Sequence, residues 1–193
     1  MVRIPYPIVP ILLFYGARSK PNPPPSCRRM TRWYAIRTTA RWELLASNEL
    51  SRRGIETYLP ISRVKRRWSD RIKIIDQPLF PGYLFGRFRL AERVRVLEVP
   101  GVRQIVGIGN TPAPILASEI ENLRTLVAAQ PFLVPWPYLT AGQRVRISRG
   151  PLAGVEGFVV RAEEGALRIV VSVDLLQRSV AAQIDRDCIG AAE

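Results

Sequence analysis

One stretch, residues 77–88, constrains the fold of this 193-residue chain more than any other. It begins as a turn, because Pro78 and Pro81 fix φ and remove two backbone donors, and Gly82 adopts a positive φ at little cost. The apolar residues that follow, 83–88, read as a β-strand. The sequence therefore predicts a tight turn that leads directly into an apolar strand.

Side chains alternate between the two faces of such a strand, so Tyr83, Phe85 and Arg87 share one face and Leu84 and Phe88 share the other. Both faces are largely apolar. Two interpretations follow: either the strand is buried on both sides, or Tyr83 and Phe85 form an exposed patch for a protein partner. The strand alone does not choose between them.

Charge is distributed unevenly along the chain, whose net charge is +13. Residues 1–32 hold six basic residues and no acid, residues 33–130 hold 16 basic and nine acidic residues, and residues 131–193 hold seven of each. This asymmetry predicts two modules with different partners, the first of them near nucleic acid. The alternative is a basic surface that only keeps the protein in solution.

The chain has no histidine and two cysteines, Cys27 and Cys188, in no metal-binding spacing. Without histidine the commonest general base and most zinc sites are excluded. The carboxylates form no motif with a base or a metal, so we expect a noncatalytic protein without cofactor or metal. Two isolated cysteines fit a reducing cytosol, and we expect a cytoplasmic location.

The first 30 residues differ from the rest, since residues 1–32 hold seven of the 17 prolines. The apolar run Ile8–Tyr15 is broken by Pro10 and lacks a small-residue cleavage site, which argues against a signal peptide, and it is too short to span a membrane. Met30 stands just before the first expected strand. We expect residues 1–30 to be a disordered extension or an upstream start-site artefact, and we expect no membrane association.

Residues 31–129 alternate between the periods of strands and helices. Thr38 or Thr39 is expected to cap the first helix, Gly54 to end it, and Ser118 with Glu121 to form a capping box for the last helix. The order predicts a small α+β sandwich with a mostly antiparallel sheet. Its strands are expected at 33–37, 55–60, 83–88 and 102–107, its helices after Thr39, at 90–97 and from Ser118, and a loop around Pro112 and Pro114. The helical stripes are expected to bury Trp42, Leu45, Ala46 and Leu50 in the first helix, Leu90, Val94 and Leu97 in the second, and Ile120, Leu123 and Val127 in the third.

Residues 61–76 are expected to form a β-hairpin with Ser69 and Asp70 at its turn. Its basic residues and one tryptophan predict contacts with phosphates and with an unpaired base. The alternative is a solvated hairpin whose charges only maintain solubility. The candidate nucleic-acid contacts of the arm are Arg63, Lys65, Arg66, Arg67, Trp68, Arg71 and Lys73.

The proline-rich residues 130–139 are expected to be a linker. Residues 140–190 follow, in which short alternating strands are separated by glycine turns. Such a pattern predicts a small closed β-barrel, because closure removes open sheet edges.

Taken together, these modules resemble the NusG family of transcription elongation factors. The resemblance runs from about Trp33 to Ile189. It rests on the Trp33-Tyr34 start, the motif at residues 80–85, Val99-Pro100-Gly101-Val102 with residues 112–115, and a KOW motif from Gly142 to Gly157. It implies an N-terminal NGN domain joined by the linker to an SH3-like KOW barrel.

In that family the NGN domain binds the clamp helices of bacterial RNA polymerase, bridges the cleft and suppresses pausing or termination. The resemblance implies that Phe80, Tyr83 and Phe85 contact the polymerase, and it places residues 92–95 near the opposite side of the cleft. The short hairpin is similar to the specialised antiterminator branch, which includes RfaH and the UpxY group, and this implies a role at particular operons.

Members of that branch read non-template DNA with their first helix, where this chain has Trp42, Leu45 and Glu49. These residues depart from the pattern, and Arg37 and Arg41 remain candidates for contacts with the DNA backbone. Leu175, Leu176 and Arg178 match the KOW loop that binds ribosomal protein uS10 or Rho. We expect a monomer. The alternatives are a general housekeeping factor or a ribosome-associated RNA-binding KOW protein.

Overall fold

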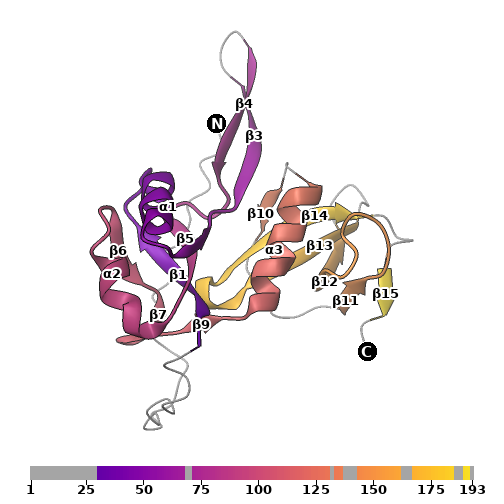
Figure 1. The fold of residues 1–193 in the computed structure, drawn as a ribbon. Helices are drawn as coiled ribbons and strands as arrows, with labels where there is room; N and C mark the ends of the chain where they lie inside the picture. The colour runs from indigo at the N-terminus through magenta and orange to yellow at the C-terminus, as the bar shows by residue number, and fades with distance from the viewer. Residues whose placement is uncertain are drawn as a thin grey trace.

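The computed structural model describes residues 30–67, 71–130, 133–136, 143–161, 167–184 and 189–191 (Figure 1). Its N-terminal part is built on a five-stranded sheet of order β2-β5-β1-β6, in which β9 also pairs with β1. Every pair is antiparallel, so the predicted α+β character and antiparallel sheet are confirmed. The strands of this N-terminal sheet are β1 (Arg32–Thr38), β2 (Glu56–Tyr58), β5 (Tyr83–Phe88), β6 (Val102–Ile105) and β9 (Pro114–Ile115).

Helices cover both faces of the N-terminal sheet. Helix α1 (Glu43–Arg52), the 3-10 helix η2 (Leu90–Glu92) and helix α2 (Arg93–Leu97) lie on one side, which we call the α1 face. Helix α3 (Ala117–Ala129) lies on the other side, the α3 face. Because β5 is central, its alternating side chains are divided between these two faces as the sequence predicts.

The predicted helix caps are wrong. Helix α1 begins after Trp42 and α3 begins after Leu116, and neither residue makes a side-chain capping hydrogen bond. The backbone N–H of Glu119 bonds instead to the carbonyl of Leu116, at 3.1 Å, which starts α3 before Ser118. The predicted end of α1 is confirmed, since Gly54 follows it with φ of +78°.

The predicted apolar stripes are only half buried. In α1, Ala46 and Leu50 are fully buried, but Trp42 and Leu45 are 41% and 59% exposed.

In the second helical segment Val94 and Leu97 are 56% and 44% exposed, and Val96 is buried instead. Helices α1 and α2 are short and contact the sheet along a narrow line, so their outer apolar residues face solvent. The stripe of α3 is the best predicted, since Ile120 and Leu123 are fully buried.

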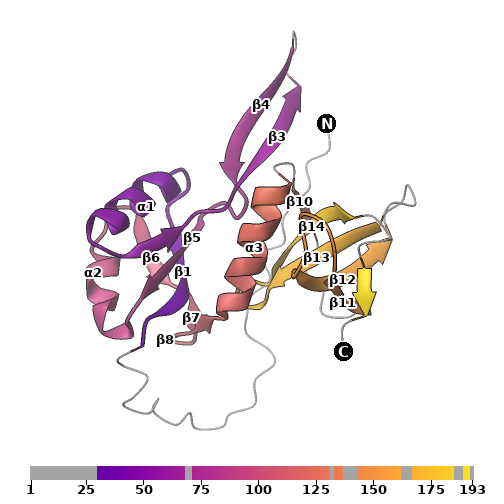
Figure 2. The same ribbon diagram turned by 45° about the vertical axis from the view of Figure 1, so that its right-hand side comes forward.

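The predicted hairpin is formed by β3 (Ile61–Arg67) and β4 (Ile72–Pro78), which we call the arm. Figures 1 and 2 both show it projecting away from the rest of the molecule. The expected loop near Pro112 contains short pairings, because β7 (Gly107–Ile108) pairs with β8 (Thr111–Pro112).

The C-terminal residues form a six-stranded antiparallel sheet of order β10-β14-β13-β12-β11-β15. Within the expected linker, residues 134–136 form edge strand β10, where Pro135 is tolerated because it lies in an edge strand. The linker itself stays a prediction. Among the described residues β10 and β15 each pair with one strand, and closure into a barrel stays a prediction. The other elements are β11 (Gln143–Ile147), β12 (Glu156–Arg161), β13 (Leu167–Val173), the 3-10 helix η3 (Asp174–Leu176), β14 (Arg178–Ile184) and β15 (Ile189–Ala191).

Two buried clusters form the core, one for each face of the N-terminal sheet. The cluster on the α1 face includes Tyr34, Ile36, Leu84 and Phe88 together with the helices of that side. The cluster on the α3 face is larger, because it continues through α3 into the C-terminal sheet. Its members include Trp33, Ala35, Phe80, Phe85, Ile120, Leu123, Leu126, Val145, Ile169, Val171 and Val180.

Candidate functional site

The turn before β5 positions Tyr83. Gly82 has φ of +81°, its N–H donates to the buried Glu43 carboxylate at 2.7 Å, and its carbonyl accepts from the N–H of Thr38 at 2.8 Å. A residue with a side chain is strained at this φ, and loss of the carboxylate leaves a backbone donor without its partner. Glu43 therefore helps to position the turn before Tyr83, a role that the sequence analysis missed, although the sequence did place Glu43 near the start of the first helix.

The predicted exposed aromatic patch is not open in this structure. Phe80 is 2% exposed and Phe85 is completely buried, while Tyr83 is half-buried. The Phe85 ring lies 6.0 Å from that of Phe80, edge to face, and 6.3 Å from that of Tyr58. Of the two interpretations of β5, burial on both sides is the one observed, and the prediction that Phe85 is exposed is wrong.

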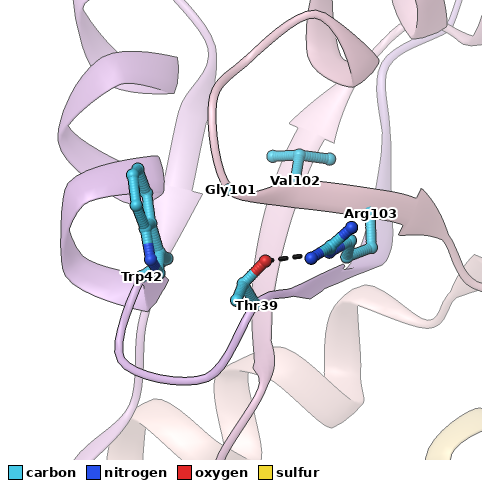
Figure 3. Close-up of a pocket in the computed structure, with 5 residues that line it drawn as sticks. All are labelled: Thr39, Trp42, Gly101, Val102 and Arg103. Carbon is cyan, nitrogen blue, oxygen red and sulfur yellow. Dashed lines mark hydrogen bonds between the residues drawn. The ribbon is translucent and has the colours of Figure 1, made fainter.

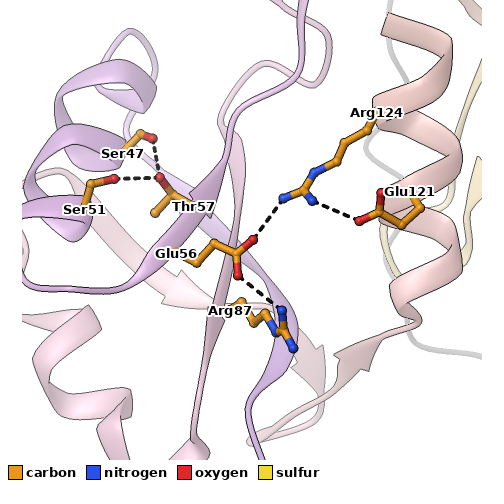
Figure 4. A network of polar contacts seen from close by, with 7 residues as sticks. All are labelled: Ser47, Ser51, Glu56, Thr57, Arg87, Glu121 and Arg124. Carbon is orange, nitrogen blue, oxygen red and sulfur yellow. Dashed lines mark hydrogen bonds and ion pairs between the residues drawn. The ribbon is translucent and has the colours of Figure 1, made fainter. Parts of the chain in front are cut away.

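Helix α3 is the first cover on this face, and Arg124 holds it there. The Arg124 guanidinium lies 5.1 Å from the centroid of the Trp33 ring and 5.2 Å from that of Tyr58. It also pairs with Glu56 at 3.1 Å and with Glu121 at 2.9 Å (Figure 4). A planar cation can stack on aromatic rings and bind carboxylates at the same time, so one residue of α3 contacts both core and rim of the sheet.

Burial under α3 has an electrostatic consequence for Tyr58. Its hydroxyl is buried and has no hydrogen-bond partner among the described residues. Burial raises the pKa of Tyr58, and the nearby Arg124 opposes this only in part. The ring therefore acts as an apolar support for Arg124 and not as an acid or base.

The C-terminal sheet is the second cover on this face. The Arg178 guanidinium lies 5.2 Å from the centroid of the Tyr83 ring, and Leu175 and Leu176 pack against the same core as Phe85. The predicted partner loop of the C-terminal part and the predicted polymerase surface of the N-terminal part thus lie against one another. Each therefore covers part of the other.

Polar contacts fix the C-terminal sheet to α3. The Asn122 side chain donates to the carbonyl of Glu156 at 3.4 Å, and the side chain of Gln130 makes two hydrogen bonds with the backbone of Gln183. Glu119 is half-buried near η3, where partial burial first and the Asp174 carboxylate second raise its pKa. A carboxylate with a raised pKa weakens this contact when it is ionised.

The arm is the second candidate site, and its predicted residues lie along the two strands. Arg63 pairs with Asp76 at 3.6 Å, with both side chains more than half exposed, and the side chains of Arg67, Arg71 and Lys73 are exposed. Lys65 is also exposed. Trp68, with Ser69 and Asp70 at the expected turn, and the side chain of Arg66 lie outside the described residues.

A third basic region surrounds the start of α1. Arg37 is exposed on the α3 face, directly opposite Tyr83 in the register of β1 and β5, and Arg41 is exposed with φ of +69°. The ring of Trp42 packs on Gly101, beside an open hollow where the Arg103 guanidinium donates to the Thr39 hydroxyl at 2.9 Å (Figure 3).

Ion pairs are present in the two segments to which the family resemblance gives a role, the first helix and residues 92–95. Glu49 on α1 pairs with Arg52 and Arg53, at 3.7 and 3.4 Å. Glu92 receives hydrogen bonds from the side chain and backbone of Arg89, which hold the pKa of its carboxyl below the usual value. These contacts stabilise helix ends, while Trp42 before α1 and Leu44 and Leu45 within it are exposed apolar residues.

The described residues contain no group of three or more histidine, cysteine or acidic side chains that could hold a metal ion. Across the same residues, no helix combines the length and the apolar character needed to cross a bilayer. Cys27 and Cys188 lie outside the described part of the chain.

The family model and the similar proteins of known name point to the same family. The model of the family described as NusG, transcription termination factor, matches residues 31–124. The transcription termination/antitermination protein NusG of Borreliella burgdorferi is 25% identical over 173 residues, covering 79% of this chain and 94% of the relative. The protein of the same name from Deinococcus radiodurans is 27% identical over 180 residues, covering 79% and 95%.

A solved structure described as "Domain interaction in Thermotoga maritima NusG" is also similar to this chain. The two sequences are 20% identical, the alignment covers 84% of this chain and 98% of the other, and the TM-score is 0.48.

Proposed function

Because this chain belongs to the NusG family of transcription termination and antitermination factors, we propose that its N-terminal part binds the clamp helices of bacterial RNA polymerase, bridges the cleft and suppresses pausing or termination. The proposed contact surface is centred on Tyr83, with Phe80 and Phe85 as its buried floor. One observation carries this proposal. Tyr83 lies at the edge of an aromatic core, and the cation over its ring, Arg178, comes from the C-terminal sheet.

Polymerase binding then requires the C-terminal sheet to move away. The contacts that hold it combine partly exposed polar groups with an apolar surface, and partly exposed polar pairs contribute little stability each. Displacement uncovers Tyr83 beside the exposed Arg37, which gives an apolar and cationic surface of the kind that binds a partner through a few central residues. Helix α3 stays in place, since Arg124 attaches it to the N-terminal sheet.

We propose that the same displacement frees the C-terminal part as a KOW module tethered by the linker. Its loop residues Leu175, Leu176 and Arg178 would bind ribosomal protein uS10 or Rho. Leu175 and Leu176 are half-buried against the core of the α3 face, so they become an apolar surface only when the two parts separate.

The nucleic-acid contacts form a further part of the proposal. Arg37, Arg41 and the basic residues of the arm would contact nucleic-acid phosphates near the polymerase, non-template DNA among them. Support comes from their exposure and from the projection of the arm away from the body.

Mutual cover of the two partner surfaces favours a specialised factor over a general one. A factor whose polymerase surface is covered binds only where a further interaction displaces the cover, because its affinity is reduced by the fraction of molecules that are open. A housekeeping role, the alternative, calls for a surface that is open in most molecules.

The test is recovery of core RNA polymerase on the tagged full-length protein. Arg178→Ala removes the cation that covers Tyr83, so it should increase recovery, and Tyr83→Ala should reduce recovery about tenfold or more in both backgrounds. Leu44→Ala, which removes an apolar side chain that is 58% exposed on α1, is the matched control and should have no effect. Equal recovery of polymerase by the natural protein and by Tyr83→Ala would show that Tyr83 is not part of the contact surface. If neither the natural protein nor any variant recovers polymerase, the proposal of polymerase binding is wrong.

A further inference from the structure

One face of the arm carries cations on one strand and isoleucines on the other. In the register of the arm, Lys65 stands opposite Ile74 and Arg67 stands opposite Ile72. Residues directly opposite one another in an antiparallel pair have side chains on the same face. Arg63, two residues from Lys65, continues the basic row on this face.

The isoleucines of this face are unusually open. Ile72 is 68% exposed and Ile74 is 52% exposed, whereas Val64 and Ile75, which pair on the opposite face, are half-buried. An isolated exposed aliphatic residue needs no explanation, but two in one row beside a row of cations form an ordered surface.

We propose that this face binds a single strand of nucleic acid lengthwise, with phosphates along β3 and bases over the isoleucines of β4. The inference rests on the proposed function and names the ligand of its basic arm. Neighbouring strands lie about 4.8 Å apart, so the basic and apolar rows are adjacent. A single polynucleotide strand has the same asymmetry, with charge on one edge and flat apolar base surfaces on the other.

The spacing along β3 also fits a polymer of charges. Successive cations on one face of a strand are separated by two residues, about 6.7 Å. Arg63, Lys65 and Arg67 therefore form a linear row of cations and not a compact cluster, with Arg63 at the end of the row also paired with Asp76. Such a series matches a repeating backbone better than it matches one isolated anion.

A duplex fits this face less well. Its grooves are lined by phosphates on both sides, so a ribbon that enters a groove gains from cations on both strands. Here β4 contributes Ile72, Ile74 and the acidic Asp76 to the same face. An anionic membrane also fits less well, because a lipid surface favours apolar residues flanked by cations on both sides.

The test measures binding of full-length protein to a fluorescently labelled mixed-sequence DNA strand, by anisotropy at several KCl concentrations and without polymerase. An RNA strand, the matching duplex and a strand of the same length that lacks bases are measured in parallel. We expect the natural protein to bind single strands more tightly than the duplex. Whichever single strand, DNA or RNA, is bound more tightly is then assigned as the ligand of this face.

Two double variants separate the two rows. Ile72→Ser with Ile74→Ser should weaken binding to the single strand about tenfold, leave the salt dependence unchanged and leave binding to the base-free strand unchanged. Lys65→Gln with Arg67→Gln should lower the slope of log affinity against log salt concentration by about 1.4, since each phosphate contact on a single strand contributes about 0.7.

Matched controls change the same numbers of side chains elsewhere. Leu44→Ser with Ile108→Ser removes two exposed apolar residues, which are 58% and 48% exposed, and Arg52→Gln with Arg149→Gln removes two exposed cations. Both controls should bind the strand like the natural protein. Because every changed residue is exposed, unfolding is not expected, and circular dichroism checks this.

Several outcomes would overturn the inference. These are tighter binding to the duplex, equal affinity of the isoleucine variant and the natural protein for the strand, or binding to anionic phosphatidylserine vesicles that the isoleucine changes abolish. None of these outcomes bears on the recovery of polymerase through Tyr83, because the strand-binding assay contains no polymerase and the recovery test changes no residue of the arm. The failure of the inference is therefore distinguishable from the failure of the proposed function.

Discussion

The two faces of the N-terminal sheet are both buried, but segments of different kinds cover them. On the α1 face, short helices that follow β1 and β5 directly in the chain supply the cover. On the α3 face, the cover consists of α3 and of the C-terminal sheet, which both come later in the chain than β6. Arg124 of α3 lies over the Tyr58 ring, and Arg178 of the C-terminal sheet lies over the Tyr83 ring. Under the proposed function the first face is a permanent core, whereas the second includes an interface that separates when a partner binds.

The largest expected effect contrasts a residue of each face. Phe88 on the α1 face is 1% exposed, with its ring 4.8 Å from that of Tyr34, so Phe88→Ala should cost about 3–5 kcal/mol of unfolding free energy. Tyr83→Ala on the α3 face should cost about 1 kcal/mol, because that ring is half-buried beneath Arg178. Urea unfolding followed by far-UV circular dichroism measures both. Equal costs would show that the two faces are cores of the same kind.

A smaller effect is expected at the residue that attaches α3. Arg124→Ala removes contacts with two aromatic rings and two carboxylates, and it should cost about 1–2 kcal/mol and speed hydrogen exchange of the α3 amides. The control, Arg52→Ala, removes an ion pair to Glu49 whose arginine side chain is 80% exposed, and it should cost less than about 0.5 kcal/mol. If exchange in α3 does not change, Arg124 does not hold the helix.

Local sequence predicted the elements of the α1 face well, since strand alternation and glycine positions depend on neighbouring residues. The faces of β5, the end of α1 at Gly54 and the hairpin arm followed from such rules. The caps did not, because backbone bonds to Leu116 replaced the expected side-chain cap of α3. Neither did the exposure of Trp42, which depends on how narrow the contact between α1 and the sheet is.

The candidate site could be predicted only in part, because its cover comes from distant residues. The aromatic residues Tyr83 and Phe85 were identifiable as a group, whereas the pair of Glu121 and Arg124 within one helix was missed. The pairing of Arg124 with Glu56 joins residues 68 positions apart, and no periodic pattern reports such a contact. The position of Arg178 over Tyr83 likewise depends on how two sheets pack.

The pH dependence of stability should have opposite signs on the two faces, and this is the smallest effect expected. Burial raises the pKa of Glu119 at the contact between α3 and η3, so the folded state binds its proton more tightly than the unfolded state does. The stability that Glu119 contributes is complete below the unfolded pKa and is lost as the pH rises through the folded pKa. Hydrogen bonds from Arg89 lower the pKa of Glu92 beside α2, so its contribution is complete above the unfolded pKa and is lost as the pH falls through the folded pKa.

Glutamine variants isolate these two contributions from the other carboxylates. Glu119→Gln keeps the neutral form at every pH, so its advantage in unfolding free energy over the natural protein at pH 7.5 should shrink on acidification towards pH 4. Glu92→Gln should instead be less stable than the natural protein at pH 7.5, and that deficit should shrink only when the pH falls below 4.5, the ordinary pKa of this carboxyl, because the folded-state pKa is lower still. Urea unfolding of the three proteins at matched ionic strength measures these differences. If Glu119→Gln is not more stable than the natural protein at pH 7.5, the contact between α3 and η3 does not weaken when Glu119 ionises.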